Sequence, residues 1–267
     1  MNQFKRLAGQ TIIYGFGTIA PRVLNFLLLT PLYTRILNKG EYGIFTELYA
    51  YIVFLLVILT YGMETGFFRF AKSEKDFNKV YSTSLIALFT TSFLFIVLTS
   101  IFSSQLATAI DYEHNENYIR WFCIIVSIDA FTSIPFAKLR LEGKAAKFGI
   151  LKIINVLVNI SLNALFFLVF PQIFKSNPEL ISRFYNPEMG VSYIFIANLI
   201  ASIVTLVLLL PEIVRFKLNF DFNLLKRMLV YTFPLLIVGI AGSANEVLDK
   251  ILMKYLVTDP TTALEQV

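Results

Sequence analysis

VYSTSLIALFTTSFLFIVLTSIFSSQLATAI, residues 80–110, contains no charged side chain. A helix that crosses the hydrocarbon core of a bilayer needs roughly 20 mostly apolar residues, and this stretch is longer than that. Residues 153–174 and 189–211 are equally free of charge. A soluble domain of 267 residues has no place for three such runs, so the sequence predicts a polytopic membrane protein.

The composition agrees with a membrane-embedded chain, because hydrophobic residues make up 57% of it and charged residues 15%. In a soluble protein the net charge of +5 would suggest nucleic acid as a partner. Here we attribute it to the basic excess of cytoplasmic loops, and we expect no nucleic-acid partner. The chain has one cysteine, Cys123, and one histidine, His114, which excludes an internal disulfide and a Cys/His metal site. Neither a metal nor a cofactor is expected.

The apolar segments predict an all-α fold, a bundle of about seven transmembrane helices. Helices are expected because a lone strand leaves its backbone unsatisfied in lipid, and the segments are too long for barrel strands. The predicted spans are residues 9–34, 43–66, 80–104, 118–138, 148–172, 190–212 and 228–256.

Basic residues alternate from one connecting loop to the next. The N-terminal segment and the second, fourth and sixth loops carry Lys5, Arg6, Arg69, Lys72, Lys75, Lys79, Lys138, Arg140, Lys144, Lys147, Arg215, Lys217, Lys226 and Arg227. The first, third and fifth loops carry only Arg35, Lys39, Lys175 and Arg183. Since lysine and arginine concentrate on the cytoplasmic side, the N-terminus is predicted to be cytoplasmic.

Polar residues inside the first span share one helix face. Tyr14, Thr18, Arg22 and Asn25 follow one another at steps of 4, 4 and 3 residues. A charged group at membrane depth usually faces a cavity or a partner. Two interpretations of Arg22 stay open: it lines a cavity, or it pairs with another residue for structural reasons.

The fifth span carries a ladder of Lys152, Asn155, Asn159 and Asn163 at steps of 3, 4 and 4 residues. Such a ladder is either a hydrogen-bonded seam between helices or a wetted wall. On the sixth span, Asn198, Ser202 and Thr205 also share one face, where a seam is the favoured interpretation.

Acidic residues occur in two spans. Asp129 in the fourth span is a candidate to bind a proton or a sodium ion, although the sequence slightly favours a pair with Arg22 or Lys250. In the seventh span Glu246 and Asp249 are further candidates, and Glu246 could instead be neutralised by Lys250 four residues later.

The first and seventh spans match at an offset of 224 residues. Gly15, Ala20, Val23 and Leu24 are identical to Gly239, Ala244, Val247 and Leu248. Both spans are predicted to enter from the cytoplasm, as a parallel repeat of six helices requires. We therefore predict a first six-helix bundle over residues 1–222 and the first helix of a second bundle over residues 223–267, and we expect the chain to be an incomplete transporter.

The residues that carry a family resemblance lie in the first, second and seventh spans. They are PRVLNF (21–26), PLYTRIL (31–37), EYG (41–43), GMETGFFRF (62–70), YTFPLL (231–236), NE (245–246) and DKIL (249–252). The chain resembles bacterial polysaccharide-biosynthesis membrane proteins of the oligosaccharide flippase (Wzx-like) type. Their superfamily includes the multidrug and toxin extrusion (MATE) transporters, so the resemblance implies a MATE-like first bundle.

The resemblance implies that an undecaprenyl-diphosphate-linked oligosaccharide is moved across the bacterial inner membrane by alternating access. The residues expected to contact the substrate are Arg22, Asn25, Asn155, Asn159, Lys138 and Arg140. The residues expected to couple transport to an ion are Asp129, Glu246 and Asp249. Membrane lipid, a polysaccharide polymerase and glycosyltransferases are the further expected partners.

Three alternatives compete with a flippase. A MATE-type exporter of drugs or cations would use acidic residues and an apolar cavity rather than a central arginine. An enzyme would need a sizeable loop outside the membrane, and the loops at residues 104–117 and 171–190 are too short. A fragment that does not transport is the third alternative.

Overall fold

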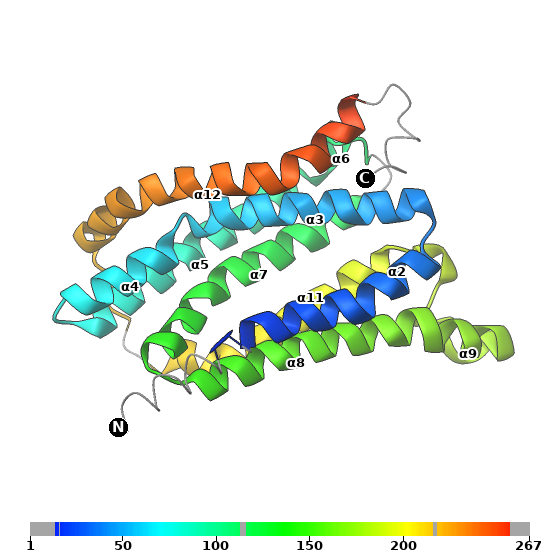
Figure 1. Cartoon of the computed structure of the whole chain (residues 1–267), viewed down its shortest axis with the longest axis horizontal. Coiled ribbons are helices and arrows are strands. Elements are labelled where there is room, and N and C mark those ends of the chain that lie inside the picture. The colour runs from blue at the N-terminus through cyan, green and yellow to red at the C-terminus, as the bar shows by residue number, and fades with distance from the viewer. Residues whose placement is uncertain (1–13, 16, 113–115, 216–217, 257–267) are drawn as a thin grey trace. The chain divides into compact units, whose positions relative to one another are not determined.

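The computed structural model describes the whole chain except residues 1–13, 16, 113–115, 216–217 and 257–267, and for residues 245–256 it describes the backbone alone. Within these limits every regular element is a helix, as predicted (Figure 1). The α-helices are α2 (Thr30–Ile36), α3 (Lys39–Thr60), α4 (Met63–Ser73), α5 (Phe77–Ile101), α6 (Ser103–Ala109), α7 (Glu116–Leu141), α8 (Ala145–Ala164), α9 (Phe170–Ser176), α10 (Pro178–Ile181), α11 (Ser192–Val214) and α12 (Phe222–Leu256). The remaining turns are the π-helical η1 (Asn25–Leu29) and η2 (Leu165–Val169) and the 3₁₀-helical η3 (Pro187–Met189).

Among the described residues, 6 helices are long and apolar enough to cross a membrane. They are Lys39–Ser73, Phe77–Ile101, Glu116–Leu141, Ala145–Ser176, Ser192–Val214 and Phe222–Ala244. Each corresponds to one of the last six predicted spans; the ends differ by 2–7 residues, except that the last of these ranges ends at Ala244, 12 residues before the predicted end. The first predicted span begins outside the described residues, but residues 17–36 are helical throughout.

The second span is longer than predicted because it continues past a tight turn. Tyr61 and Gly62 adopt left-handed conformations, with φ of 36° and 69°. Glycine tolerates such a φ without steric cost, and the chain re-enters a helix, α4, at Met63. Hydropathy alone ended this span at residue 66, because the exposed face of α4 is charged while Met63, Gly66 and Phe67 are buried.

Local sequence signals set the starts of three helices. Before α3, the Asn38 side chain accepts a hydrogen bond from the Glu41 N–H at 2.9 Å, and Glu41 accepts one from the Asn38 N–H at 3.0 Å. This reciprocal capping box satisfies two backbone donors that the first turn leaves free. Asp76 caps α5 through the Lys79 N–H, and Asp221 caps α12 through the Leu224 N–H.

Two helices contain a π-helical turn directly before a proline. In the first, the Thr30 N–H donates to the Asn25 carbonyl and Pro31 follows. In the second, the Phe170 N–H donates to the Leu165 carbonyl and Pro171 follows. Proline has no N–H to continue the regular ladder, so each helix takes up a wider turn before it.

The chain folds into two compact units, each described here by itself. Unit 1 comprises residues 1–48, 149–205 and 250–267, and unit 2 comprises residues 49–148 and 206–249. The boundary predicted after residue 222, between a first and a second helix bundle, comes from a sequence repeat and not from how the helices pack. It stays a prediction.

Aromatic side chains form the core of unit 1. Tyr193 stacks on Phe166 with ring centroids 4.5 Å apart and on Tyr185 at 5.3 Å. The Tyr193 hydroxyl accepts the Asn186 N–H at 2.7 Å and thereby ties the segment before η3 to α11. Ring stacking and this bond hold the connection between α9 and α11 onto the helices.

The core of unit 2 lies between α4, α5, α7 and α12. Met63, Phe67, Tyr81, Leu88 and Met228 are among its fully or nearly fully buried side chains. A small residue on α4, Gly66, allows α4 and α12 to approach closely. A Cβ atom at Gly66 would lie 2.6 Å from the Thr232 methyl carbon, so only glycine fits there.

Candidate functional site

The asparagine ladder of the fifth span forms hydrogen bonds between helices in unit 1. The Asn155 amide on α8 donates to the Thr205 hydroxyl on α11 at 2.9 Å. Thr205 in turn donates to the Ala201 carbonyl of its own helix at 2.9 Å. The ladder is therefore at least in part a seam between helices, one of the two interpretations that the sequence left open.

A second part of the same ladder contacts α2. The Tyr33 hydroxyl donates to Asn163 Oδ1 at 2.9 Å, and the Asn163 amide donates to Asn159 Oδ1 at 2.8 Å. Asn163 is fully buried and Tyr33 nearly so, and the Tyr33 ring makes edge contacts with Phe45 and Phe167. Each donor and acceptor in this chain of bonds is aligned by a neighbour, which fixes the three side chains in place.

Tyr33 was not among the predicted site residues. The signal for it was available, because residues 25, 29 and 33 follow at steps of four and continue the polar face of the first span. The apolar Leu29 interrupts that face, and this hid the connection.

Asn25 begins the first π-helical turn, and Arg22 lies three residues before it on the same helical stretch. Asn25 Oδ1 is buried and has no hydrogen-bond partner among the described residues. A buried acceptor of this kind carries a desolvation cost until a donor reaches it. The Arg22 side chain is exposed. Its two interpretations, a residue that lines a cavity and a residue that pairs with another for structural reasons, therefore both stay open.

The best-connected charged group in unit 2 is the carboxylate of Glu212, near the end of α11. It forms ion pairs with Lys138 of α7 at 3.0 Å and with Lys147 of α8 at 2.6 Å. Tyr81 of α5 donates to the Glu212 carbonyl at 2.9 Å, and the Lys138 ammonium lies 4.8 Å from the Tyr81 ring centroid. Four helices thus meet at the buried residue Glu212, which the sequence did not single out.

Arg140 is also engaged with a carboxylate. Its guanidinium pairs with Glu64 of α4 and lies over the rings of Phe68 and Phe148, at 5.1 and 5.6 Å from their centroids. Lys138 and Arg140, two of the residues expected to contact the substrate, therefore already hold carboxylate partners. A phosphate would have to compete with Glu212 and Glu64 for them.

Further ion pairs surround this cluster at the same end of unit 2. Lys79 pairs with Asp221 at 2.6 Å, Lys144 with Glu142 at 2.7 Å, and Arg227 with Glu74 at 2.9 Å. The hydrogen bond from Lys79 holds the pKa of Asp221 below its usual range, and the bond to Glu142 raises the pKa of Lys144. Exposed pairs of this kind contribute little individually, but two of them, Lys79–Asp221 and Arg227–Glu74, link the region where α5 begins to the start of α12.

The predicted ion-coupling residues are placed only in part. Asp129 lies half-buried on α7, where its carbonyl accepts the Thr132 hydroxyl at 3.2 Å. Glu246 and Asp249 lie on α12, but their side chains are outside the described residues. In the described part of the chain, no group of three or more His, Cys, Asp or Glu residues is placed to hold a metal ion.

These observations define a multi-pass helical membrane protein with a polar seam in unit 1 and a charged cluster in unit 2. No protein-family model and no curated protein matches the chain. A solved structure with a similar fold is that of a MOP superfamily transporter from Pyrococcus furiosus Vc1 (DSM3638), with a TM-score of 0.59 and 16% sequence identity. That protein is described as having a binding pocket of reverse polarity that suggests a different function.

The alignment with this transporter covers 88% of the chain and 52% of the transporter. The chain therefore spans about half the length of the protein that it matches. Over the aligned part the chain has a similar helix-bundle fold, as predicted.

Proposed function

We propose that this chain is a membrane transporter of the MOP (multidrug/oligosaccharidyl-lipid/polysaccharide exporter) superfamily, or part of one. The similarity of its fold to a MOP superfamily transporter over 88% of its length carries this proposal. Six described helices that could cross a membrane are consistent with it. Transport by alternating access requires no covalent chemistry, so the protein is proposed not to be an enzyme.

The proposed substrate is an undecaprenyl-diphosphate-linked oligosaccharide, moved from the inner to the outer leaflet of a bacterial inner membrane. Arg22 is suited to its diphosphate, because a guanidinium binds phosphate oxygens with two parallel hydrogen bonds. Asn25 Oδ1 is buried without a described partner and is suited to accept a sugar hydroxyl. Asn155 and Asn159 are the other amides proposed to contact sugar. On binding, they would give up their present hydrogen bonds to Thr205 and Asn163 and form bonds to sugar hydroxyls instead.

Lys138 and Arg140 are proposed to guide the anionic head group by exchanging partners. In the present arrangement Glu212 and Glu64 neutralise them. A diphosphate carries more charge than one carboxylate, so it can displace these partners while the cationic groups remain neutralised. Asp129, Glu246 and Asp249 are proposed to couple the movement to protons or sodium ions.

A MATE-type exporter of drugs or cations is the second candidate. The apolar hollows of unit 2 favour it, since apolar pockets bind hydrophobic compounds. The polar seam of unit 1 instead favours a substrate rich in hydroxyl groups, as a flippase would carry.

If the chain is a flippase, its proposed partner proteins are a polysaccharide polymerase and glycosyltransferases.

The test compares glycan export with drug resistance. Bacteria that lack their own oligosaccharide flippase would express the gene that encodes this chain, and surface glycan and drug tolerance would both be measured. A flippase restores surface glycan without raising drug tolerance. Raised drug tolerance with no surface glycan would instead identify a MATE-type exporter.

Arg22→Ala tests the central arginine in the same cells. The proposal predicts a loss of about tenfold or more in surface glycan, the effect of removing a charged hydrogen bond. Arg35→Ala is the matched control, because Arg35 is an exposed arginine at the end of the same helical stretch. Equal export by both variants would remove Arg22 from the substrate site.

A further inference from the structure

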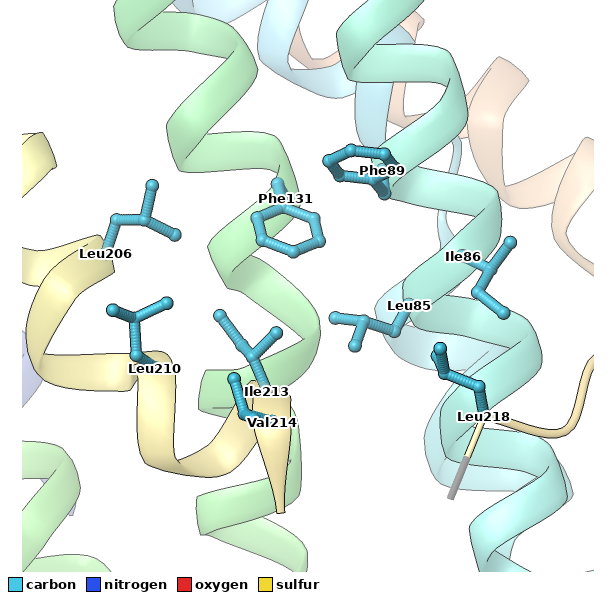
Figure 2. Close-up of a pocket in the computed structure, with 9 residues that line it drawn as sticks. All are labelled: Leu85, Ile86, Phe89, Phe131, Leu206, Leu210, Ile213, Val214 and Leu218. Atoms are coloured by element: carbon cyan, nitrogen blue, oxygen red, sulfur yellow. The ribbon is translucent and has the colours of Figure 1, made fainter. Parts of the chain in front are cut away.

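Two apolar hollows flank α5 in unit 2. The larger has a volume of about 620 Å³ and opens between α5, α7, the end of α11 and the segment after it (Figure 2). Its lining consists of Leu85, Ile86, Phe89, Phe131, Leu206, Leu210, Ile213, Val214 and Leu218. Figure 2 shows these side chains converging from the three helices, with Leu218 approaching from the segment that follows α11.

The smaller hollow has a volume of about 380 Å³. It is lined by Tyr61, Ile86, Ala87, Thr90, Thr91, Phe220, Leu225 and Leu229. Ile86 of α5 belongs to both linings, so the two hollows adjoin at this side chain.

The segment of residues 218–221 is bonded to α5 and contributes to both hollows. Leu218 lines the larger hollow and Phe220 the smaller. The Asn219 N–H donates to the Ser82 hydroxyl at 2.7 Å, and the Asp221 N–H donates to the Thr83 hydroxyl at 3.2 Å. Ser82 and Thr83 are fully buried, so these bonds fix where the segment meets α5.

The hollows combine open apolar walls with a basic end. Val214 and Leu218 are 72% and 74% exposed, so the larger hollow is open at this end. The stretch from residue 215 to residue 227 contains four basic residues and only one acidic residue, Asp221. Apolar hollows that end at a basic segment match a lipid with an anionic head group.

We propose that unit 2 binds one anionic phospholipid with two acyl chains, one chain in each hollow, with its head group near Arg215 and Lys226, the basic residues on either side of residues 218–221. Two hollows that adjoin at Ile86 fit two chains joined at one head group better than a single isoprenoid chain. The lining of α11 from Leu206 to Val214 covers about 12 Å, so it holds the upper part of a chain and leaves the rest in the bilayer. This site is separate from the polar seam of unit 1 and does not depend on the proposed function.

Tryptophan reporters test the occupancy of each hollow. In the full chain with Trp121→Phe, Leu210→Trp reports on the larger hollow and Leu229→Trp on the smaller. Val207→Trp and Val230→Trp are matched controls, because both residues are exposed on the same helices and line neither hollow. Each variant is placed in vesicles of dibrominated phosphatidylcholine, whose bromine atoms quench tryptophan, and unbrominated phosphatidylglycerol is added.

The proposal predicts that phosphatidylglycerol is preferred at both reporter positions. The binding constant of phosphatidylglycerol relative to that of phosphatidylcholine should be about 5 at residues 210 and 229, the factor expected from one basic group near an anionic head group. At the two control positions it should be about 1. Equal relative binding at all four positions would overturn the proposal and leave only bulk lipid in contact with unit 2.

Two further measurements separate the head group from the chains. Arg215→Gln with Lys226→Gln should bring the preference at residue 210 close to that of the controls, whereas Lys175→Gln should leave it unchanged. An unchanged preference in the double variant would contradict a head group at this segment. If undecaprenyl phosphate, which has one isoprenoid chain, displaced the brominated lipid at both positions better than phosphatidylglycerol, the two-chain assignment would be overturned.

Discussion

At the scale of single residues, Glu212 is a buried carboxylate that forms ion pairs with two lysines. Its carboxylate is 9% exposed and neutralises Lys138 and Lys147, which come from two other helices. Breaking a buried ion pair leaves a charge without compensation and costs about 3 kcal/mol. We expect Glu212→Gln to lower the unfolding free energy in detergent by about that amount, measured by chemical or thermal denaturation.

The matched control for Glu212 is an exposed pair. Glu116 pairs with Arg120 at 3.3 Å, one turn apart on α7. Exposed pairs contribute about 0.5 kcal/mol, so Glu116→Gln should be nearly neutral. If the two variants were equally stable, the cluster around Glu212 would have no special role in holding the helices together.

Asp221 predicts a dependence of stability on pH. Its pKa is lowered in the folded protein, first by the hydrogen bond from Lys79 and then by the N–H of Leu224. A carboxyl group with a lowered folded pKa adds stability above its unfolded pKa of about 3.9, and this contribution disappears as the pH falls through the folded pKa.

Asp221→Asn should therefore lower the melting temperature at pH 7 and at pH 5, and the difference from the unchanged protein should close in strong acid. Glu179→Gln, at an exposed carboxylate on α10, serves as the control and should show no difference at any pH. A difference for Asp221→Asn that stayed constant from pH 7 into strong acid would show that its carboxylate contributes through something other than ionisation.

At the scale of helices, the contact between α4 and α12 depends on one missing side chain. A Cβ atom at position 66 would lie 2.6 Å from the Thr232 methyl carbon. Overpacking of this kind costs about 1–3 kcal/mol, so Gly66→Ala should destabilise unit 2 by that amount in detergent unfolding.

A second substitution distinguishes overpacking from other effects of alanine. Thr232→Ser removes the methyl group that the new Cβ would meet, so Gly66→Ala with Thr232→Ser should recover most of the lost stability. Gly242→Ala on the same α12 is the control, because a Cβ there meets nothing within 4 Å. No recovery in the double variant would contradict the proposed contact.

The sequence predicted the helices well because hydropathy and length are local properties. Residues 80–110 alone defined a membrane helix, and the capping residues Asn38 and Asp76 follow the same local rules. The partners of Lys138 and Arg140 were not predictable, because Glu212 and Glu64 lie more than 60 residues away in the chain. The Tyr33–Asn163 bond was missed for the same reason, since only folding brings α2 next to α8.

At the scale of the whole molecule, the alternation of basic loops predicts the orientation in the membrane. Ser73 lies in the second loop, and Ser104 and Ser182 lie in the third and fifth loops; all three are exposed. In a Cys123→Ser background, a membrane-impermeant thiol reagent should label Ser104→Cys and Ser182→Cys on intact cells. Ser73→Cys should react only after the membrane is opened, and the reverse pattern would invert the predicted topology.

A transporter is proposed from the similarity of the fold, and a lipid-linked glycan is proposed from the polar seam of unit 1 together with Arg22 and Asn25. The transporter and its substrate are proposed on different grounds. The fold rests on the likeness to a MOP superfamily transporter. The substrate rests on the chemistry of a few side chains, so it needs a measurement of its own.

The most direct test is transport in purified vesicles. The protein would be reconstituted with an undecaprenyl-diphosphate-linked oligosaccharide whose sugar is fluorescent, and a membrane-impermeant glycosidase would report which leaflet holds the glycan. We predict that protein-containing vesicles move the glycan between leaflets at least about tenfold faster than protein-free vesicles, and that Arg22→Ala abolishes the difference. Equal rates with and without the protein would contradict the assignment as a flippase for lipid-linked oligosaccharide.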